Sequence, residues 1–193
     1  MANREALREL QSRLAQRLQA ARTDPRAASW LAFECAGQGL LTPLHTAGEI
    51  FALGTLAPLP HTQPWFLGVA NLRGLLHGVV DLAAFLGLRE ATVPQPDGAR
   101  AAREPGRLLA FNPSLGSHCA VLIDRLAGLR GAHQLTAVAE APATQRPNFA
   151  LGLWADADGR QWQELDLAAL ARHPQFLAID RPTELPTKAP AWA

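Results

Sequence analysis

The chain is 193 residues long and carries 18 basic and 17 acidic side chains, which gives a formal net charge of +1. This balance argues against nucleic-acid binding as the main task, because neutralising phosphates requires a clustered excess of lysine and arginine. Hydrophobic residues make up 48% of the chain and charged residues 18%, which is the composition of a folded protein. The sequence contains no apolar run of about 18 residues that would predict a membrane-spanning helix.

The first segment has the spacing of an amphipathic helix. Its leucines at positions 7, 10, 14 and 18 recur at steps of three and four, which places one apolar stripe along a helix. Pro25 ends the pattern, because proline cannot continue the hydrogen-bond ladder. We therefore predict an N-terminal helical extension over residues 1–28.

From residue 29 onward the sequence changes to short apolar runs separated by Gly, Pro, Asn and Asp. The segment Gly37-Gln38-Gly39 lies between the first two runs and predicts a hairpin. Many short strands with turn signals at near-regular spacing are typical of β-barrels or sandwiches. The predicted strands cover 30–35, 40–45, 65–74, 75–82, 108–112, 118–124, 133–139 and 148–154.

Short helices and loops complete this expectation. We predict small helices at 81–87 and 166–173, where the apolar runs contain alanine and leucine. Residues 88–107 are rich in Pro, Gly and Arg and predict a long exposed loop. The Pro-rich segment 181–193 predicts a loose tail.

Two parts of the chain resemble each other at a shift of 85 residues. Asp81-Leu82-Ala83-Ala84 aligns with Asp166-Leu167-Ala168-Ala169, and Gly74 aligns with Gly159. In both segments a strand, a glycine turn and a second strand lead to an aspartate, which is a favourable N-cap for a short helix. The repeat therefore predicts two similar β-rich lobes, each too small to be stable easily alone.

The sequence offers few groupings that could perform chemistry. It contains no Walker motif, no CxxC and no HExxH, and no histidine has the spacing of a metal ligand pair. Cys35 and Cys119 are 84 residues apart in apolar surroundings, which predicts buried, reduced thiols. We expect no catalytic residue, no metal and no cofactor. A binding or scaffolding role is favoured, with a small-ligand-binding β-barrel and an enzyme whose site the fold assembles as alternatives.

Residues 67–87 carry a specific resemblance. They read LGVANLRGLLHGVVDLAAFLG and resemble the CheW family, in which Gly-Val-x-Asn-Leu-Arg-Gly leads into a strand that ends in Asp-Leu. Glu49-Ile50, the run 121–126, Gly152 and Asp166-Leu167 fall in the family's order, so the resemblance extends from about residue 29 to residue 176. It implies a mainly β, CheW-like domain over residues 29–180, built from two five-stranded β-barrel subdomains.

The same resemblance implies a function. Members of the family are non-catalytic adaptors that join the cytoplasmic tips of methyl-accepting chemoreceptors to the regulatory domain of a CheA-type histidine kinase. Gly152-Leu153-Trp154 and Phe176-Leu177 look most like the branch that serves type IV pili and twitching motility. The expected location is the cytoplasm, with recruitment to receptor arrays at the cell pole and membrane contact only through the receptors.

Arg73 is the main candidate for partner contact. A guanidinium that follows a strand and precedes Gly74 can bind carboxylates or carbonyls of a partner, or it can brace its own loop. Asn71 either bonds the turn or contacts a partner, and Glu49 is either a partner-facing charge or an ordinary solvated side chain. The apolar candidates, for which core packing is the alternative, are Leu72, Val69, Leu126 and Leu129. Expected structural residues are Gly68, Gly74, Gly152, Asp81, Asp124 and Asp166.

Overall fold

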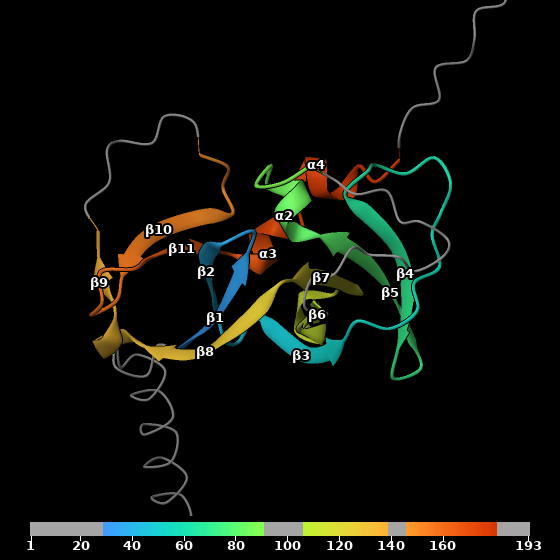
Figure 1. Ribbon diagram of the computed structural model, residues 1–193. Coiled ribbons are helices and arrows are strands. Elements are labelled where there is room, and N and C mark those ends of the chain that lie inside the picture. The colour runs from blue at the N-terminus through green and yellow to red at the C-terminus, as the bar shows by residue number, and fades with distance from the viewer. Residues whose placement is uncertain (1–28, 91–105, 139–145, 181–193) are drawn as a thin grey trace, which may run out of the picture.

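The computed structural model describes residues 29–90, 106–138 and 146–180. These residues form eleven strands in two sheets, joined by short helices (Figure 1). The predicted extension 1–28, most of the predicted loop 88–107 and the predicted tail 181–193 lie outside the described residues.

The two sheets define two lobes. The six-stranded lobe contains, in spatial order, β8 (Arg125–Gly131), β1 (Ser29–Cys35), β2 (Gln38–Pro43), β11 (Gln161–Leu165), β10 (Ala150–Ala155) and β9 (Thr136–Ala137). The five-stranded lobe contains β3 (Ala47–Ala52), β6 (Arg107–Phe111), β7 (Cys119–Ile123), β5 (Leu75–Asp81) and β4 (Phe66–Leu72). The short helices α2 (Leu82–Phe85), α3 (Leu167–Leu170) and α4 (Pro174–Leu177) lie above the junction of the lobes in Figure 1. Two 3-10 turns cover Pro113–Leu115 (η2) and Ala132–Gln134 (η3).

The five-stranded lobe is inserted between β2 and β8 of the six-stranded lobe. Strand β3 follows β2 in sequence but pairs with β6 of the five-stranded lobe. Strand β8 follows β7 but pairs with β1 of the six-stranded lobe. Figure 1 shows β8 running from the centre of the molecule toward the six-stranded lobe. The polypeptide therefore crosses between the lobes at both positions, and only the six-stranded lobe is discontinuous in sequence.

The 85-residue repeat corresponds to a repeated unit of structure. The hairpin of β4 and β5 leads into α2, and the hairpin of β10 and β11 leads into α3. Gly74 and Gly159 have positive φ values of 85° and 77° in the two turns. The second strand of each hairpin pairs in parallel with a strand of another hairpin, β5 with β7 and β11 with β2.

The core has three parts, because several strands are buried on both faces. On β1, Leu31 and Phe33 point into the core between the lobes, whereas Trp30 and Ala32 point into the six-stranded lobe. Strand β7 divides its side chains in the same way between the central core and the interior of the five-stranded lobe. Strands covered on both faces have continuous apolar sequences, which explains why these runs do not alternate.

The prediction of a mainly β fold with two lobes is confirmed, and the details differ from two five-stranded barrels. Within the described residues the sheets have six and five strands and are not closed barrels. The short strand β9 supplies the sixth strand. In the five-stranded lobe, the edge strand β4 is joined by a single bridge, between Val69 and Ala57, to the chain that continues from β3.

The predicted hairpins are confirmed, but two strands were missed. Strands β3 and β8 lack the uninterrupted apolar run that predicts a strand, because Gly48 and Glu49 interrupt one and Gly128 and Arg130 the other. The predicted strand at 133–139 is mostly wrong, since η3 occupies its start and only Thr136–Ala137 pairs. Residue 139 lies outside the described residues.

Candidate partner-binding site

The turn between β4 and β5 presents Arg73 to solvent. Leu72 pairs with Leu75, so Arg73 and Gly74 form a two-residue loop, and both have positive φ values, of 52° and 85°. This is the geometry of a type I′ turn, in which asparagine and glycine are favoured and arginine is unusual. The Asn71 side chain supports the turn, because its Oδ1 accepts a hydrogen bond of 2.7 Å from the backbone N of Gly74.

Arg73 forms an ion pair with Glu49. Its Nη2 lies 2.5 Å from Glu49 Oε1, and the two side chains are 75% and 44% exposed. Glu49 comes from β3, at the opposite edge of the sheet from β4, so the ion pair shows that the two edges approach each other. Exposed ion pairs contribute only about 0–1 kcal/mol to stability. This pair is therefore a minor stabilising contact, and both charges remain accessible to another molecule.

A cavity of about 480 Å³ lies beside this ion pair. Glu49, Asn71 and Arg73 line it together with apolar residues of β3, β4 and β6. Leu72 also lines it but is otherwise buried in the interior of the five-stranded lobe, so a partner could reach Leu72 only through the cavity. The structure thus brings four of the seven candidate contact residues together.

The other three candidates lie elsewhere. Val69 is half-buried on β4, and its backbone exchanges two hydrogen bonds of 2.8 and 2.9 Å with Ala57. Leu126 and Leu129 are exposed on β8, in the six-stranded lobe. The candidate contacts therefore form one group on each lobe.

The sequence did not reveal two exposed leucines at the candidate site. Leu75 and Leu76 follow directly after Arg73 and Gly74 and are more than half exposed. An apolar pair at the start of a predicted strand suggests core packing, and only the observed turn geometry shows that the pair lies at the exposed end of the hairpin.

Three expected structural glycines differ in what surrounds them. Gly68 has a φ of 121°, and a Cβ built on it would lie 2.2 Å from the carbonyl oxygen of Ala57. Gly74 has open space around it, so its positive φ alone favours glycine. A Cβ on Gly152 would lie 3.4 Å from Nε1 of Trp154, which is ordinary contact.

The family model of the CheW-like domain matches residues 29–175. The chain belongs to the CheW-like domain family. Protein PilI of Pseudomonas aeruginosa is 35% identical over 75 residues, which span 39% of this chain and 42% of PilI. The crystal structure of the scaffolding protein TtCheW from Thermoanaerobacter tengcongensis has the same fold, with a TM-score of 0.54 and 16% identity, covering 72% of this chain and 88% of that one.

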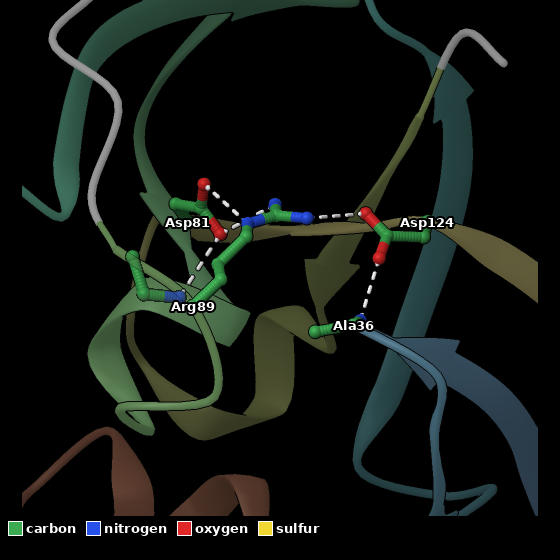
Figure 2. Close-up of polar contacts among 5 residues, drawn as sticks. Ala36, Asp81, Arg89 and Asp124 are labelled. Carbon is green, nitrogen blue, oxygen red and sulfur yellow. Dashed lines mark hydrogen bonds and ion pairs between the residues drawn. The ribbon is translucent and has the colours of Figure 1, made fainter. Parts of the chain in front are cut away.

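The CheW-like domain contains a cluster of charges at the junction of its lobes, in which Asp81 is buried, Arg89 is mostly buried and Asp124 is partly exposed (Figure 2). Arg89 donates from Nε and Nη2 to the two carboxylate oxygens of Asp81, at 3.3 and 2.7 Å, and from Nη1 to Oδ1 of Asp124 at 2.7 Å. The second oxygen of Asp124 accepts from the backbone N of Ala36 at 2.6 Å. Burial alone would lower the pKa of Arg89, but its hydrogen bonds to Asp124 and Asp81 outweigh burial and raise the pKa.

Asp81 and Asp166 each begin a helix of the CheW-like domain. Asp81 Oδ1 accepts from the backbone N of Ala84, and Asp166 Oδ1 accepts from those of Ala168 and Ala169. Asp124 has a different position, between β7 and β8. Arg89 was missed as a structural residue, because it lies at the edge of the segment that predicts an exposed loop.

The two thiols of the CheW-like domain are buried, and its described residues offer no metal site. Cys35 and Cys119 are free and buried, as expected, and burial raises the pKa of both thiols to about 12. The described residues contain no cluster of three or more His, Cys, Asp or Glu side chains that could hold a metal ion. None of the described helices has the length and apolar character needed to cross a membrane.

Proposed function

We propose that this chain is a non-catalytic adaptor in a chemotaxis-type signalling system. It couples methyl-accepting receptors to a CheA-type histidine kinase by contacting the receptor tip and the regulatory domain of the kinase. Membership of the CheW-like domain family supports this role. The observation that carries it is the exposed guanidinium of Arg73, held beside Glu49 at the rim of the cavity.

The turn geometry supports a binding role for Arg73. A non-glycine residue at a positive φ costs conformational energy, and Asn or Gly would satisfy a type I′ turn at lower cost. Since the exposed ion pair with Glu49 returns little stability, local folding alone does not account for an arginine here. Contact with an acidic group or carbonyl of a partner accounts for an arginine here, because the guanidinium can donate two parallel hydrogen bonds.

The finer part of the proposal concerns the signalling system. Similarity to PilI, together with the sequence features at Gly152-Leu153-Trp154 and Phe176-Leu177, supports an adaptor that controls type IV pili and twitching motility. The protein then acts in the cytoplasm, is recruited to receptor arrays at the cell pole and reaches the membrane only through the receptors.

Binding measurements with charge variants test the proposal. The purified kinase regulatory domain and a receptor tip fragment are titrated with the wild type, with Arg73→Glu and with Arg73→Asn. We expect the first variant to lose about tenfold or more in affinity for at least one partner. We expect Arg73→Asn to bind less tightly as well while folding at least as stably, because asparagine suits the turn.

Arg172→Glu is the matched control, since it reverses an exposed arginine that follows α3, away from the cavity. We expect this control to bind like the wild type. A folded wild-type protein without affinity for either partner contradicts the proposed function, and equal losses in the Arg73 and Arg172 variants contradict the role of Arg73.

A small-ligand-binding role is the second candidate, and the cavity is the observation that favours it. Its volume of about 480 Å³ falls within the range of about 300–1,000 Å³ that is usual for ligand pockets. A thermal-shift screen of metabolites tests this role. A saturable increase in melting temperature that disappears in Arg73→Glu would favour a ligand, and a screen without such an increase would count against one.

A further inference from the structure

The apolar core joins the two lobes through contacts that carry no hydrogen bonds or charges. Residues from both sheets and from the short helices pack together there, among them Phe33 of β1, Phe111 of β6 and Leu167 of α3. Apolar burial is a non-directional force, so hydrogen bonds and ion pairs supply the contacts that depend most steeply on angle. Directional contacts between the lobes are therefore the ones that can define their orientation.

The charge cluster around Arg89 supplies such contacts. Asp124 is the single residue between β7 of the five-stranded lobe and β8 of the six-stranded lobe. Its backbone N donates to the Glu34 carbonyl at 2.9 Å, and its carboxylate accepts from the Ala36 amide in the β1–β2 turn. Arg89 ties this corner to Asp81, at the end of β5. Figure 2 shows the guanidinium lying between the two carboxylates.

Burial raises the energetic cost of breaking these contacts. The Arg89 and Asp81 side chains are only 11% and 1% exposed. A charge that loses its partner in such a site is strongly destabilising, because it can no longer be solvated. The contacts also need the shape of arginine, since one planar guanidinium donates from three nitrogens to two carboxylates, which the single ammonium of lysine cannot reproduce.

The second crossing between the lobes is held differently. Between β2 and β3, the hydroxyls of Thr42 and Thr46 are 3.1 Å apart, and the backbone N of Asn112 donates to the Thr46 carbonyl at 3.0 Å. These contacts are neutral, and they are individually weaker than charge-assisted hydrogen bonds. The charged crossing at Asp124 is therefore the stronger directional link.

We propose that Arg89 is a positioning residue that fixes the orientation of the two lobes. It thereby sets the spacing between the Arg73 site on one lobe and Leu126 and Leu129 on the other. Replacing Arg89 leaves the contact residues of both lobes intact. It weakens the binding of a partner that contacts both lobes. The effect of Arg89 on partner binding rests on the proposed function, whereas its effect on the orientation of the lobes does not.

The test measures the distance between the lobes directly. Spin labels are attached to Ala157→Cys and Leu76→Cys, at exposed positions on the six-stranded and five-stranded lobes. The natural thiols are buried with pKa values of about 12, so they need not be removed. We expect Arg89→Gln and Arg89→Lys to shift or broaden the distance distribution.

Hydrogen exchange at one amide gives a second readout. The Ala36 amide donates to the Asp124 carboxylate, which Arg89 holds in place. We expect the Ala36 amide to exchange about tenfold faster or more in the Arg89 variants, because a hydrogen bond to a charged group is weakened when the acceptor is released.

Arg160→Gln is the control, because it breaks an ion pair of 2.7 Å with Glu34 that lies within the six-stranded lobe alone. We expect it to change neither readout. A folded Arg89→Gln protein with the wild-type distances and wild-type Ala36 exchange would overturn the proposal. If the Gln variant does not fold, the Lys variant, which keeps the charge, decides on the same two readouts. Failure of the wild type to bind a kinase or a receptor contradicts the proposed function. The spin-label distances still test whether Arg89 sets the orientation of the lobes.

Discussion

Backbone conformation at single residues determines how the five-stranded lobe closes. At Gly68 the backbone has a positive φ and passes so close to the Ala57 carbonyl that no side chain fits between them. The adjacent Val69 bonds Ala57, so this close approach joins the chain after β3 to the edge strand β4. The resemblance singled out Gly68, but its physical reason becomes visible only when Ala57 is in place.

Gly68→Ala is therefore expected to destabilise the protein by roughly 3 kcal/mol, since it combines a strained φ with a steric clash. Gly87→Ala is the matched control, because Gly87 has a φ of 70° but open space around it. The control is expected to lose only about 1 kcal/mol, from the φ alone. Urea unfolding measures both values, and equal losses would show that the approach of Ala57 does not matter.

Two arginines show how far residue-level prediction from the sequence reaches. Arg73 was found because it lies inside a recognisable motif, although its ion pair with Glu49 and its positive φ were not predicted. Arg89 was not found, because proline, glycine and arginine around it predict solvent exposure, whereas Asp81 and Asp124 bury it. Partners that are distant in sequence decide the role of a charged residue, and one sequence does not identify them.

At the scale of elements, local sequence patterns predicted the hairpins, but they did not predict which strands pair over long distances in sequence. The hairpins of β1 with β2 and of β4 with β5 follow from apolar runs on either side of a turn, and that of β10 with β11 follows from the 85-residue repeat. The pairing of β3 and β8 does not follow, because nothing in their own residues specifies pairing with β6 or β1. Their mixed burial also hides the alternation that normally identifies a strand.

The repeated unit allows one helix cap to be compared with another. Asp166→Ala removes only cap bonds at α3 and is expected to cost about 1 kcal/mol. Asp81→Ala removes the cap of α2 and also leaves the buried Arg89 with one carboxylate fewer, so we expect a loss of roughly 3 kcal/mol. Thermal or urea unfolding compares the two. Equal losses would mean that Asp81 acts as a cap alone.

The five-stranded lobe is inserted into the six-stranded lobe, and this arrangement affects how the whole molecule unfolds. Because β3–β7 form one sheet between β2 and β8 of the other, cutting the chain after residue 90 removes strands from both sheets and exposes the shared core. The repeat in the sequence predicted two lobes, but it did not show that the six-stranded lobe is split in sequence by the continuous five-stranded lobe. Two such lobes should lose their structure together, as a single cooperative unit.

We therefore expect one unfolding transition, observed equally from both lobes. Hydrogen exchange of β1 and β2 amides reports on the six-stranded lobe, and hydrogen exchange of β6 and β7 amides reports on the five-stranded lobe. The two sets of amides should give the same urea midpoint. A chain ending at residue 90 should remain unfolded, because β3 would lack its partner β6 and β5 its partner β7. Two separate midpoints, or a folded fragment with the native β1–β2 hairpin and native exchange protection in β5, would show that the lobes are independent despite their shared core. A common midpoint would mean that a destabilising substitution in one lobe also weakens the partner surface of the other.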